Sequence, residues 1–543
     1  MNDELDTCRR SPTKGTLNLT NSERRWAIIT ATKWQKRTKT FKCKLIRCSL
    51  HHKSRTSSTS LWLKQSYIGG EWLDATSGDT FEVRNPANMQ VIGCVPDMTA
   101  VEAQKAIDDA TRAFYAPEWK WITARERSQL LKNWHILISQ HCAELANIIT
   151  AESGKPLTES LSEVAYGRSF VEWFAEETRR IDGQLIASSV RNQELLVLRE
   201  PLGVTALITP WNFPMALVLR KAAAALAAGC TVVVKPDENT PLTCLALAKL
   251  SQMACIPAGV FNVITTSRAP AIGKLFCQSP LVCGISFTGS TEVGKLLFRE
   301  SAGLLKRVSL ELGGNAPFIV FESADIADAV KGAMLSKFRN AGQTCVSANR
   351  FYIHSAVYED FLKQLQAQVE ALKIGPGHDK GVEIGPLINT AQLKRIGTFM
   401  KDALSRHAKV VCGGKRLQDI GELFYAPTII TDVDRTARIY REEIFGPVIT
   451  LAKFDTEDEV VTRANSSLRG LAGYFYSQNI QEVFRVARRL EVGIVGVNVG
   501  LTSQAEAPFG GIKESGIGRE GGHYGIDEFT EIKYICLGGL KYD

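Results

Sequence analysis

The stretch V-T-A-L-I-T-P-W-N-F-P (residues 204–214) decides the fold of this chain, because it begins a regular alternation of apolar strands and helices. A helical stretch (217–228), the apolar run T-V-V-V-K (231–235) and a second helical stretch (242–253) follow it, and F-N-V-I-T and G-I-S-F then read as further strands. Continuous Val and Ile runs between helices are typical of a parallel, doubly wound sheet. The sequence therefore predicts an α/β fold.

A second alternation of the same kind follows Glu311. The run A-P-F-I-V-F precedes a helical stretch that ends at Phe338, and R-F-Y-I-H precedes another that ends at Leu372. Two α/β units are therefore predicted to meet near Glu311, and we expect a cleft between them to hold the chemistry.

The segment before residue 204 predicts short strands from Tyr67 onward, then two amphipathic helices. The first covers residues 100–114 with Thr99 as its N-cap, and the second covers residues 124–153. Residues 185–201 read as a hairpin placed between the last helix and the sheet.

The chain has 543 residues, which is enough for two or three domains. Its net charge of +8 comes from residues 1–60, which hold 14 Lys+Arg and 4 Asp+Glu, while the rest holds 51 and 53. A nearly neutral body does not indicate a nucleic-acid partner. No apolar run reaches the roughly 18–20 residues that a membrane span needs, so no membrane partner is expected.

Residues 24–60 contain no acidic residue and are rich in Arg, Lys, Ser and Thr, as organellar transit peptides are. The opening M-N-D-E-L-D is acidic and atypical of one. A mitochondrial transit peptide, and a disordered extension on a cytoplasmic protein, both stay open. The 13 cysteines show no C-x-x-C pair and no metal-ligand spacing, so no metal is expected.

Cys345, in the run G-Q-T-C, and Glu311, 34 residues upstream, are the candidate reactive pair. A thiolate is a strong nucleophile toward a carbonyl carbon. A carboxylate can activate the thiol or, in a later step, a water molecule.

Two glycine-rich segments are candidates for binding a phosphate. The triplet Gly516, Gly518 and Gly521 matches G-x-G-x-x-G, but it lies too close to the C-terminus for a βαβ unit to follow, so we interpret it as a turn near the active-site rim. The run F-T-G-S-T-E-V-G (287–294) follows a strand and opens a helix. Its backbone N–H groups can face a pyrophosphate.

Six motifs in one order resemble the aldehyde dehydrogenase superfamily, and the resemblance covers roughly residue 61 to the C-terminus. They are P-W-N-F-P, V-V-K-P, F-T-G-S-T-E-V-G-K, L-E-L-G-G, G-Q-T-C and E-E-I-F-G-P. Within the superfamily the chain is most similar to succinate-semialdehyde dehydrogenases. The resemblance implies an NAD-binding domain (61–184 and 205–310), a catalytic domain (311–524) and an oligomerisation arm (185–204 and 525–543).

The resemblance also implies an assembly and a cofactor. The arm and the strand at residues 532–537 are expected to pair with a neighbouring subunit, giving a homodimer or homotetramer. Lys235 and Glu238 are assigned to the adenosine ribose, and Glu443 and Phe445 to the nicotinamide ribose and ring. Further cofactor contacts are assigned to Thr209, Pro210, Trp211, Gly289, Ser290, Gly294 and Leu312.

Glu238 favours NAD as the cofactor, because a carboxylate accepts hydrogen bonds from both ribose hydroxyls and repels a 2′-phosphate. NADP stays the alternative. By resemblance, Cys345 forms a thiohemiacetal whose oxyanion is stabilised by Asn212 and the Cys345 N–H. After hydride transfer, Glu311 activates the water that hydrolyses the thioester.

Arg220, Arg339 and Ser503 match the substrate contacts of semialdehyde dehydrogenases, and a guanidinium binds a distal carboxylate bidentately. The leading hypothesis is oxidation of succinate semialdehyde to succinate. Glutarate semialdehyde, one methylene longer, and a broader range of aldehydes stay open. A cysteine hydrolase or acyltransferase without hydride transfer, and a non-catalytic descendant, are alternatives of another class.

Overall fold

The computed structural model describes residues 60–541. The basic extension expected over residues 1–60, with its hypothesis of a transit peptide, lies outside the described residues except for Ser60. In the part that is described, no helix is long and apolar enough to cross a membrane.

The first sheet has eight strands in the order β2-β1-β9-β8-β7-β10-β11-β21. Its parallel centre consists of β9 (Phe261–Val263), β8 (Thr231–Lys235), β7 (Val204–Ile208), β10 (Val282–Thr288) and β11 (Arg307–Glu311). This centre confirms the predicted doubly wound unit. The edges depart from the all-parallel prediction, because three short strands join antiparallel: β1 (Ser66–Ile68), β2 (Glu71–Leu73) and β21 (Gly516–Ile517).

The second sheet has seven strands in the order β14-β15-β16-β13-β12-β18-β19. Their bounds are β14 (Lys409–Cys412), β15 (Thr428–Thr431), β16 (Val448–Phe454), β13 (Ala348–His354), β12 (Ala316–Val320), β18 (Ala472–Tyr476) and β19 (Ile494–Val497). All neighbours run parallel except β14 and β15. The sequence prediction of a second α/β unit after Glu311 is therefore confirmed.

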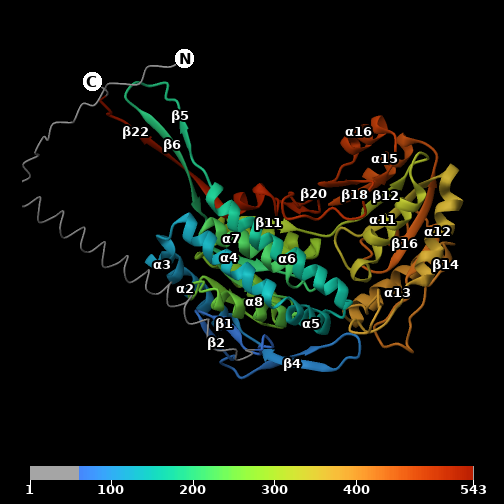
Figure 1. Cartoon of the computed structure of the whole chain (residues 1–543), viewed down its shortest axis with the longest axis horizontal. Coiled ribbons are helices and arrows are strands. Elements are labelled where there is room, and N and C mark those ends of the chain that lie inside the picture. Colours follow the sequence, from blue (N-terminus) through green and yellow to red (C-terminus); the bar gives the residue numbers. More distant parts are fainter. Residues whose placement is uncertain (1–59, 542–543) are drawn as a thin grey trace, which may run out of the picture. The chain divides into compact units, whose positions relative to one another are not determined.

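Helices surround both sheets (Figure 1). Those of the first unit are α2 (Ala100–Tyr115), α3 (Pro117–Lys120), α4 (Ala124–Gln140), α5 (Cys142–Ser153), α6 (Leu157–Glu177), α7 (Ala216–Ala228), α8 (Pro241–Met253), α9 (Ala269–Gln278) and α10 (Thr291–Ser301). Those of the second are α11 (Ile326–Phe338), α12 (Tyr358–Ala371), α13 (Thr390–Ser405), α14 (Arg438–Arg441), α15 (Glu457–Asn465) and α16 (Ile480–Arg489).

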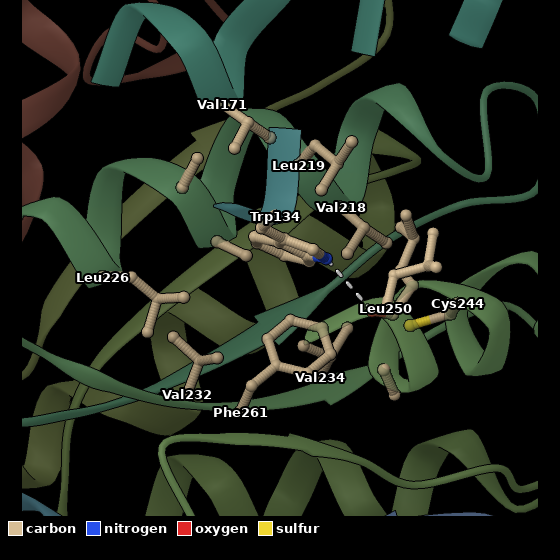
Figure 2. Close-up of a cluster of buried hydrophobic side chains, with 14 of the residues drawn as sticks. Trp134, Val171, Val218, Leu219, Leu226, Val232, Val234, Cys244, Leu250 and Phe261 are labelled. Carbon is tan, nitrogen blue, oxygen red and sulfur yellow. Dashed lines mark hydrogen bonds between the residues drawn. The ribbon is translucent and has the colours of Figure 1, made fainter. Parts of the chain in front are cut away.

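Trp134 of α4 lies at the centre of the first unit's core (Figure 2). Its ring meets that of Phe261 edge to face at 5.4 Å between centroids, and its Nε1–H donates to the Leu247 carbonyl at 3.2 Å. The core therefore joins α4 and α8 to the sheet that carries the site.

The helix boundaries match the sequence prediction with one exception. Thr99 caps α2 through a capping box with Glu102, as expected. The single helix predicted over residues 124–153 is wrong, because the chain turns at His141 and forms α4 and α5 instead. The backbone at His141 (φ −101°, ψ 18°) leaves the helical range. No glycine or proline signals this break.

The predicted hairpin consists of β5 (Gln184–Ile186) and β6 (Glu194–Pro201), and β22 (Thr530–Leu537) completes a three-stranded antiparallel sheet in the order β22-β6-β5. This sheet projects away from the helices in Figure 1. The expected pairing with a neighbouring subunit stays a prediction. Two small sheets remain, β3 (Thr80–Arg84) with β4 (Val91–Pro96) and β17 (Arg469–Gly470) with β20 (Ile512–Lys513).

Candidate active site

A cavity of about 800 Å³ opens where the two α/β units meet. Most residues that the sequence analysis assigned to cofactor or chemistry line it: Thr209, Pro210, Trp211, Asn212, Lys235, Glu238, Gly289, Ser290, Glu311, Leu312, Cys345, Glu443 and Phe445. Gly294, Arg220, Arg339 and Ser503 do not line it. Segments far apart in the sequence are thus brought together at one place.

Strand order explains why the cavity lies here. The chain leaves β7 toward β8 on one side and returns to β10 on the other, so β7 and β10 are the neighbours at which the winding direction reverses. Loops at the carboxyl ends of such strands diverge and leave a crevice. Thr209 follows β7, Gly289 follows β10, and Glu311 is the last residue of β11.

Gly289, Ser290 and Gly294 shape the start of α10 on one wall of the cavity. The Ser290 hydroxyl caps the helix by accepting from the Val293 N–H at 3.3 Å. A Cβ on Gly294 would lie 2.4 Å from the Leu312 side chain, so only glycine allows Leu312 to pack there. Gly294 therefore contributes through the wall it supports, and this loop with its helix start fits an anionic group.

Lys235 and Glu238 lie at the carboxyl end of β8. The buried Lys235 Nζ is 3.2 Å from Glu238 Oε2, and the Glu238 side chain is 43% exposed. Lys235 holds the carboxylate at the cavity edge, where its oxygens can still accept further hydrogen bonds.

Glu443 and Phe445 reach the cavity from the second unit. Burial raises the pKa of Glu443 to about 7, although its Oε1 accepts from the Gly314 N–H at 3.0 Å. The Phe445 ring meets that of Trp211 edge to face at 5.4 Å. The backbone of Phe445 is left-handed (φ +54°), which is strained for a bulky side chain.

Gln392 and Arg395 of α13, which the sequence analysis missed, hold this strained loop. Gln392 Nε2 donates to the Phe445 carbonyl at 2.6 Å, and Arg395 Nη2 donates to the Glu443 carbonyl at 2.8 Å. Both side chains line the cavity. No local motif marked them, because their partners are about 50 residues away along the chain.

Cys345 lies in the loop before β13 and lines the same cavity. Burial raises the pKa of the Cys345 thiol to about 12; Arg220 and Arg339 act to lower it, and Glu311 and Glu443 act to raise it. The resting group is therefore a thiol that needs a base or a nearby cation for ionisation.

Glu311 is buried, and neither carboxylate oxygen has a hydrogen-bond partner among residues 60–541. Burial and the charge of Glu520 raise the pKa of Glu311 well above its usual value, while Arg220 and Lys221 act in the opposite sense. An unpartnered carboxyl with a raised pKa is suited to accept a proton.

Asn212 follows β7 and is held by its neighbours. Its side-chain Nδ2 donates to the Gln343 carbonyl at 3.1 Å. Its backbone carbonyl accepts from Lys155 Nζ at 2.6 Å and from Asn340 Nδ2 at 3.1 Å. An amide nitrogen carries two hydrogens, so one N–H remains for another acceptor. This fixed amide can serve as an oxyanion donor.

Arg220 is already paired within the chain. Its guanidinium forms a buried ion pair with Glu520 and stacks on the Phe509 ring at 4.1 Å. Lys221 contacts the same carboxylate. Burial acts to raise the pKa of Glu520, but the two cations outweigh this effect and hold the pKa below its usual value. The sequence analysis missed Lys221 and Glu520, whose pairing spans 299 positions.

In the described part of the chain, Arg339 is not held by a carboxylate as Arg220 is. Its guanidinium lies over the Phe213 ring at 4.7 Å, and within the described range it forms no ion pair shorter than 4 Å. It acts electrostatically on both Glu159 and Cys345. Ser503 is half-buried in the loop that follows β19.

The G-x-G-x-x-G segment is not a turn throughout, because Gly516 belongs to the short strand β21, while the chain bends at Gly518 and Gly521. Gly516, Gly518 and Gly521 all have positive φ values, of +142°, +90° and +69°. Gly516 pairs with Glu311 across β21 and β11, which places this segment beside the reactive carboxylate. Over the described residues, no cluster of three or more His, Cys, Asp or Glu side chains could hold a metal ion.

Comparisons with known proteins agree with this geometry. Residues 72–535 match the model of the aldehyde dehydrogenase family. The chain is 51% identical over 484 residues to the NADP(+) succinate-semialdehyde dehydrogenase of Escherichia coli, covering 89% of this chain and 100% of that one. It is 52% identical over 478 residues to the mitochondrial succinate-semialdehyde dehydrogenase of Mus musculus, covering 88% and 90%.

Two further similarities concern substrate and cofactor. The chain is 49% identical over 480 residues to a glutarate-semialdehyde dehydrogenase of Pseudomonas aeruginosa, covering 88% of this chain and 99% of that one. The NAD+ complex of an aldehyde dehydrogenase from Bacillus cereus superposes with a TM-score of 0.87 at 37% identity, covering 90% and 99%.

Proposed function

This chain belongs to the aldehyde dehydrogenase family, and we propose that it oxidises succinate semialdehyde to succinate with NAD, through a thioester on Cys345. The observation that carries the proposal is that Cys345, Glu311 and Asn212 line one cavity, with Arg220 and Arg339 acting electrostatically on the thiol.

The cavity fits a nicotinamide dinucleotide. The start of α10 suits the pyrophosphate, Lys235 and Glu238 suit the adenosine ribose, and Glu443 and Phe445 suit the nicotinamide end. The bound cofactor supplies a hydride acceptor. The protein orients it, and the partly exposed Cys345 lines the same cavity.

In the first step, the Cys345 Sγ bonds to the aldehyde carbon and the carbonyl oxygen becomes an oxyanion. The free N–H of Asn212 and the backbone N–H of Cys345 stabilise that charge. Glu311, when ionised, is the nearby base for the thiol proton, and Arg220 and Arg339 favour the thiolate electrostatically. Loss of a hydride from carbon then leaves the thioester.

Glu311 then releases the thiol proton to solvent, and in the second step it removes a proton from a water molecule, which attacks the thioester carbon. The carbon–sulfur bond breaks, the carboxylic acid leaves, and Cys345 regains its proton. The raised pKa of Glu311 makes it a stronger base than an ordinary carboxylate.

Selectivity for a distal carboxylate is assigned to the two arginines and Ser503. Arg220 Nη2 is buried without a hydrogen-bond partner in the described part of the chain, although Glu520 balances the charge of the group. Arg339 lacks such a partner carboxylate at contact distance and is therefore the stronger candidate for binding the substrate anion.

NAD is the proposed cofactor because Glu238 opposes a 2′-phosphate. The Escherichia coli relative carries NADP(+) in its name, so NADP is the alternative to test. The mitochondrial relative from Mus musculus supports a mitochondrial location, with residues 1–60 as the transit peptide. The arm formed by β5, β6 and β22 supports a homodimer or homotetramer.

The experiment compares kcat/KM for succinate semialdehyde, glutarate semialdehyde and butanal, each with NAD and with NADP. We expect the highest value for succinate semialdehyde with NAD. A higher value for glutarate semialdehyde would favour the activity named for the Pseudomonas relative. Equal values for butanal would overturn carboxylate selectivity, and absence of NADH formation with every aldehyde would favour the hydrolase or acyltransferase alternative.

A further inference from the structure

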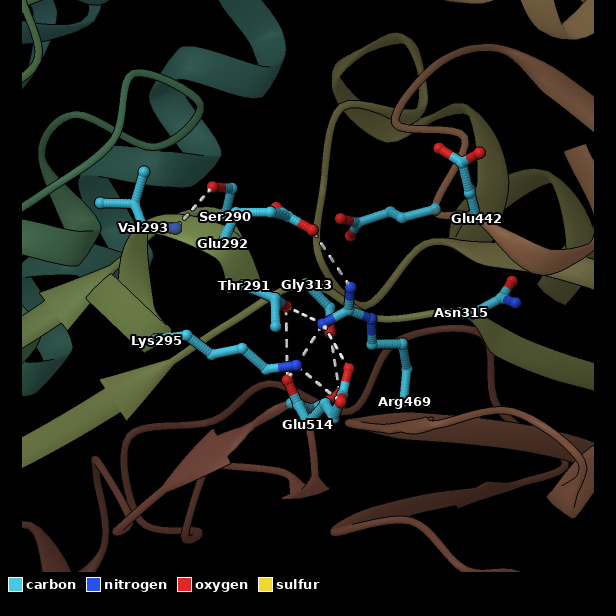
Figure 3. A network of polar contacts seen from close by, with 12 residues as sticks. Ser290, Thr291, Glu292, Val293, Lys295, Gly313, Asn315, Glu442, Arg469 and Glu514 are labelled. Carbon is cyan, nitrogen blue, oxygen red and sulfur yellow. Dashed lines mark hydrogen bonds and ion pairs between the residues drawn. The ribbon is translucent and has the colours of Figure 1, made fainter. Parts of the chain in front are cut away.

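Arg469 lies on the cavity wall where the two units face each other. It belongs to β17 of the second unit, and its guanidinium reaches across to the start of α10 in the first (Figure 3). The sequence analysis did not single it out, and the mechanism proposed above does not use it.

One nitrogen of this guanidinium is firmly anchored. Arg469 Nη1 contacts the Thr291 hydroxyl closely and donates to the Glu514 carbonyl at 3.2 Å. Lys295 Nζ holds the Glu514 carboxylate at 2.6 Å. Because Thr291 and Lys295 both belong to α10, the contacts in Figure 3 fix the guanidinium beside the helix start.

The backbone beside Arg469 is fixed as well. The Gly470 N–H donates to the Ser515 hydroxyl at 2.9 Å, and that hydroxyl donates to the Gly313 carbonyl at 2.8 Å. Gly313 itself lines the cavity. The guanidinium is therefore positioned before any ligand enters, which lowers the entropy lost on binding.

The opposite edge of the guanidinium has no hydrogen-bond acceptor among the described residues. Arg469 Nη2 is 3.6 Å from the nearest Glu292 oxygen, beyond hydrogen-bond range, and the Glu292 side chain is 78% exposed. An exposed, loosely held ion pair contributes little. The Nε and Nη2 hydrogens thus form a rigid fork that donates no hydrogen bond to a described residue and faces the Glu292 carboxylate only as an ion pair at 3.6 Å.

The surrounding charge is acidic. Glu292 and Glu443 line the cavity, and Arg469 acts electrostatically on Glu443; Glu442, which also lines it, is paired with Arg438 at 2.7 Å and Arg395 at 3.7 Å. A pyrophosphate entering between these carboxylates would be repelled unless a fixed cation offset them. Arg469 supplies that cation beside the N-terminus of α10, which itself favours an anion.

We propose that Arg469 binds the pyrophosphate of the dinucleotide through its Nε and Nη2 hydrogens. The assignment rests on the proposed function, since it takes the dinucleotide as the ligand. It implies no preference between NAD and NADP, because Lys235 and Glu238 follow β8, two strands away from β10. Arg469 therefore contributes to affinity for both cofactors alike.

The test measures ligand dissociation constants by calorimetry, without aldehyde, for Arg469→Leu, Arg469→Gln and Arg469→Lys. We expect Arg469→Leu and Arg469→Gln to raise Kd for NAD, NADP and ADP-ribose by one common factor of about ten to a hundred, the usual loss for a hydrogen bond to a charged group. Arg469→Lys should recover part of the affinity. Adenosine, which lacks phosphate, should bind all variants equally.

Arg485→Leu is the matched control, because it removes an arginine that pairs with Glu457 at 2.8 Å and does not line the cavity; its cofactor affinity should stay within about twofold of wild type. Glu514→Gln removes the carboxylate that contacts Lys295 and, at 3.7 Å, Arg469 Nη1, but keeps the Arg469 charge and should lose less affinity than Arg469→Leu. An equal loss in Glu514→Gln and Arg469→Leu, or an equal loss for adenosine and NAD, would show that Arg469 only holds α10 in place, and would overturn the proposal. An unchanged Kd in Arg469→Leu and Arg469→Gln would overturn it too.

These outcomes are separate from the proposed function. Wild-type protein that binds NAD but oxidises no aldehyde would refute the function and leave the assignment of Arg469 standing. Wild-type oxidation of succinate semialdehyde together with an unchanged Kd in the Arg469 variants would support the function and refute the assignment of Arg469.

Discussion

At the residue scale, burial disfavours the charged form of both reactive groups. Cys345 and Glu311 both have raised pKa values, caused first by burial. The charges that develop on these groups and on the carbonyl oxygen during reaction are therefore stabilised by Arg220, Arg339 and the donors around that oxygen.

Arg339→Ala should reduce kcat/KM for succinate semialdehyde by about ten- to a few-hundred-fold, since a charge-assisted hydrogen bond to the distal carboxylate is lost. Butanal, which has no such carboxylate, is the internal control and should lose little. Equal losses on both substrates would instead indicate a disturbed Cys345 loop, because Arg339 and Cys345 share one short segment.

Glu238→Ser should shift the preference toward NADP, because it removes the carboxylate that opposes a 2′-phosphate and frees Lys235. The ratio of kcat/KM with NAD to that with NADP measures the effect. If the ratio stays as in wild type, the preference is set by another part of the cavity, such as Lys274 on its rim.

At the element scale, the parallel strands and their helices could be predicted because continuous apolar runs alternate with helical periods. The antiparallel edge strand β21 could not be predicted, because it has only two residues. The break at His141 was not predicted, because no glycine or proline marks it. Motifs placed the cavity residues, whereas Gln392, Arg395, Glu520 and Arg469 act on distant segments and carry no local signal.

Gly294→Ala should weaken NAD binding and lower the unfolding temperature, because a Cβ would meet the buried Leu312 side chain at 2.4 Å and push it into the cavity wall. Overpacking of this kind costs about 1–3 kcal/mol. Gly303→Ala is the matched control, since nothing lies within 4 Å of an added Cβ there. If both variants bind NAD as wild type does, Leu312 can move freely and does not shape the site.

At the scale of the whole molecule, the arm carries apolar side chains that the described part of the chain leaves uncovered. Leu185 on β5 is 71% exposed and Ile532 on β22 is 69% exposed, and β6 lies between these two strands. Apolar residues on an extended sheet indicate a surface that another subunit covers. The local pattern of residues 185–201 predicted the hairpin, and only the resemblance to a family predicted its role as an oligomerisation arm.

Ile532→Glu should lower the mass measured by light scattering toward that of one chain, because a buried, unpaired carboxylate disfavours the interface. Val101→Glu changes a side chain of the same 69% exposure on α2 and should leave the mass unchanged. A wild-type protein that already runs as a single chain would refute the oligomerisation arm outright.

The central claim is that turnover passes through a thioester on Cys345 that Glu311 hydrolyses, and Glu311→Gln tests it most directly. After mixing with NAD and succinate semialdehyde, this variant should show a burst of NADH followed by slow turnover, and mass spectrometry should find one succinyl group on the Cys345 peptide. In wild type, hydrolysis should accelerate as pH rises through the raised pKa of Glu311, since only the ionised carboxylate accepts a proton, and the variant should lose this dependence. Cys345→Ser should show neither burst nor adduct. A Glu311→Gln enzyme that slows burst and turnover equally, or that carries no adduct on Cys345, would contradict the account.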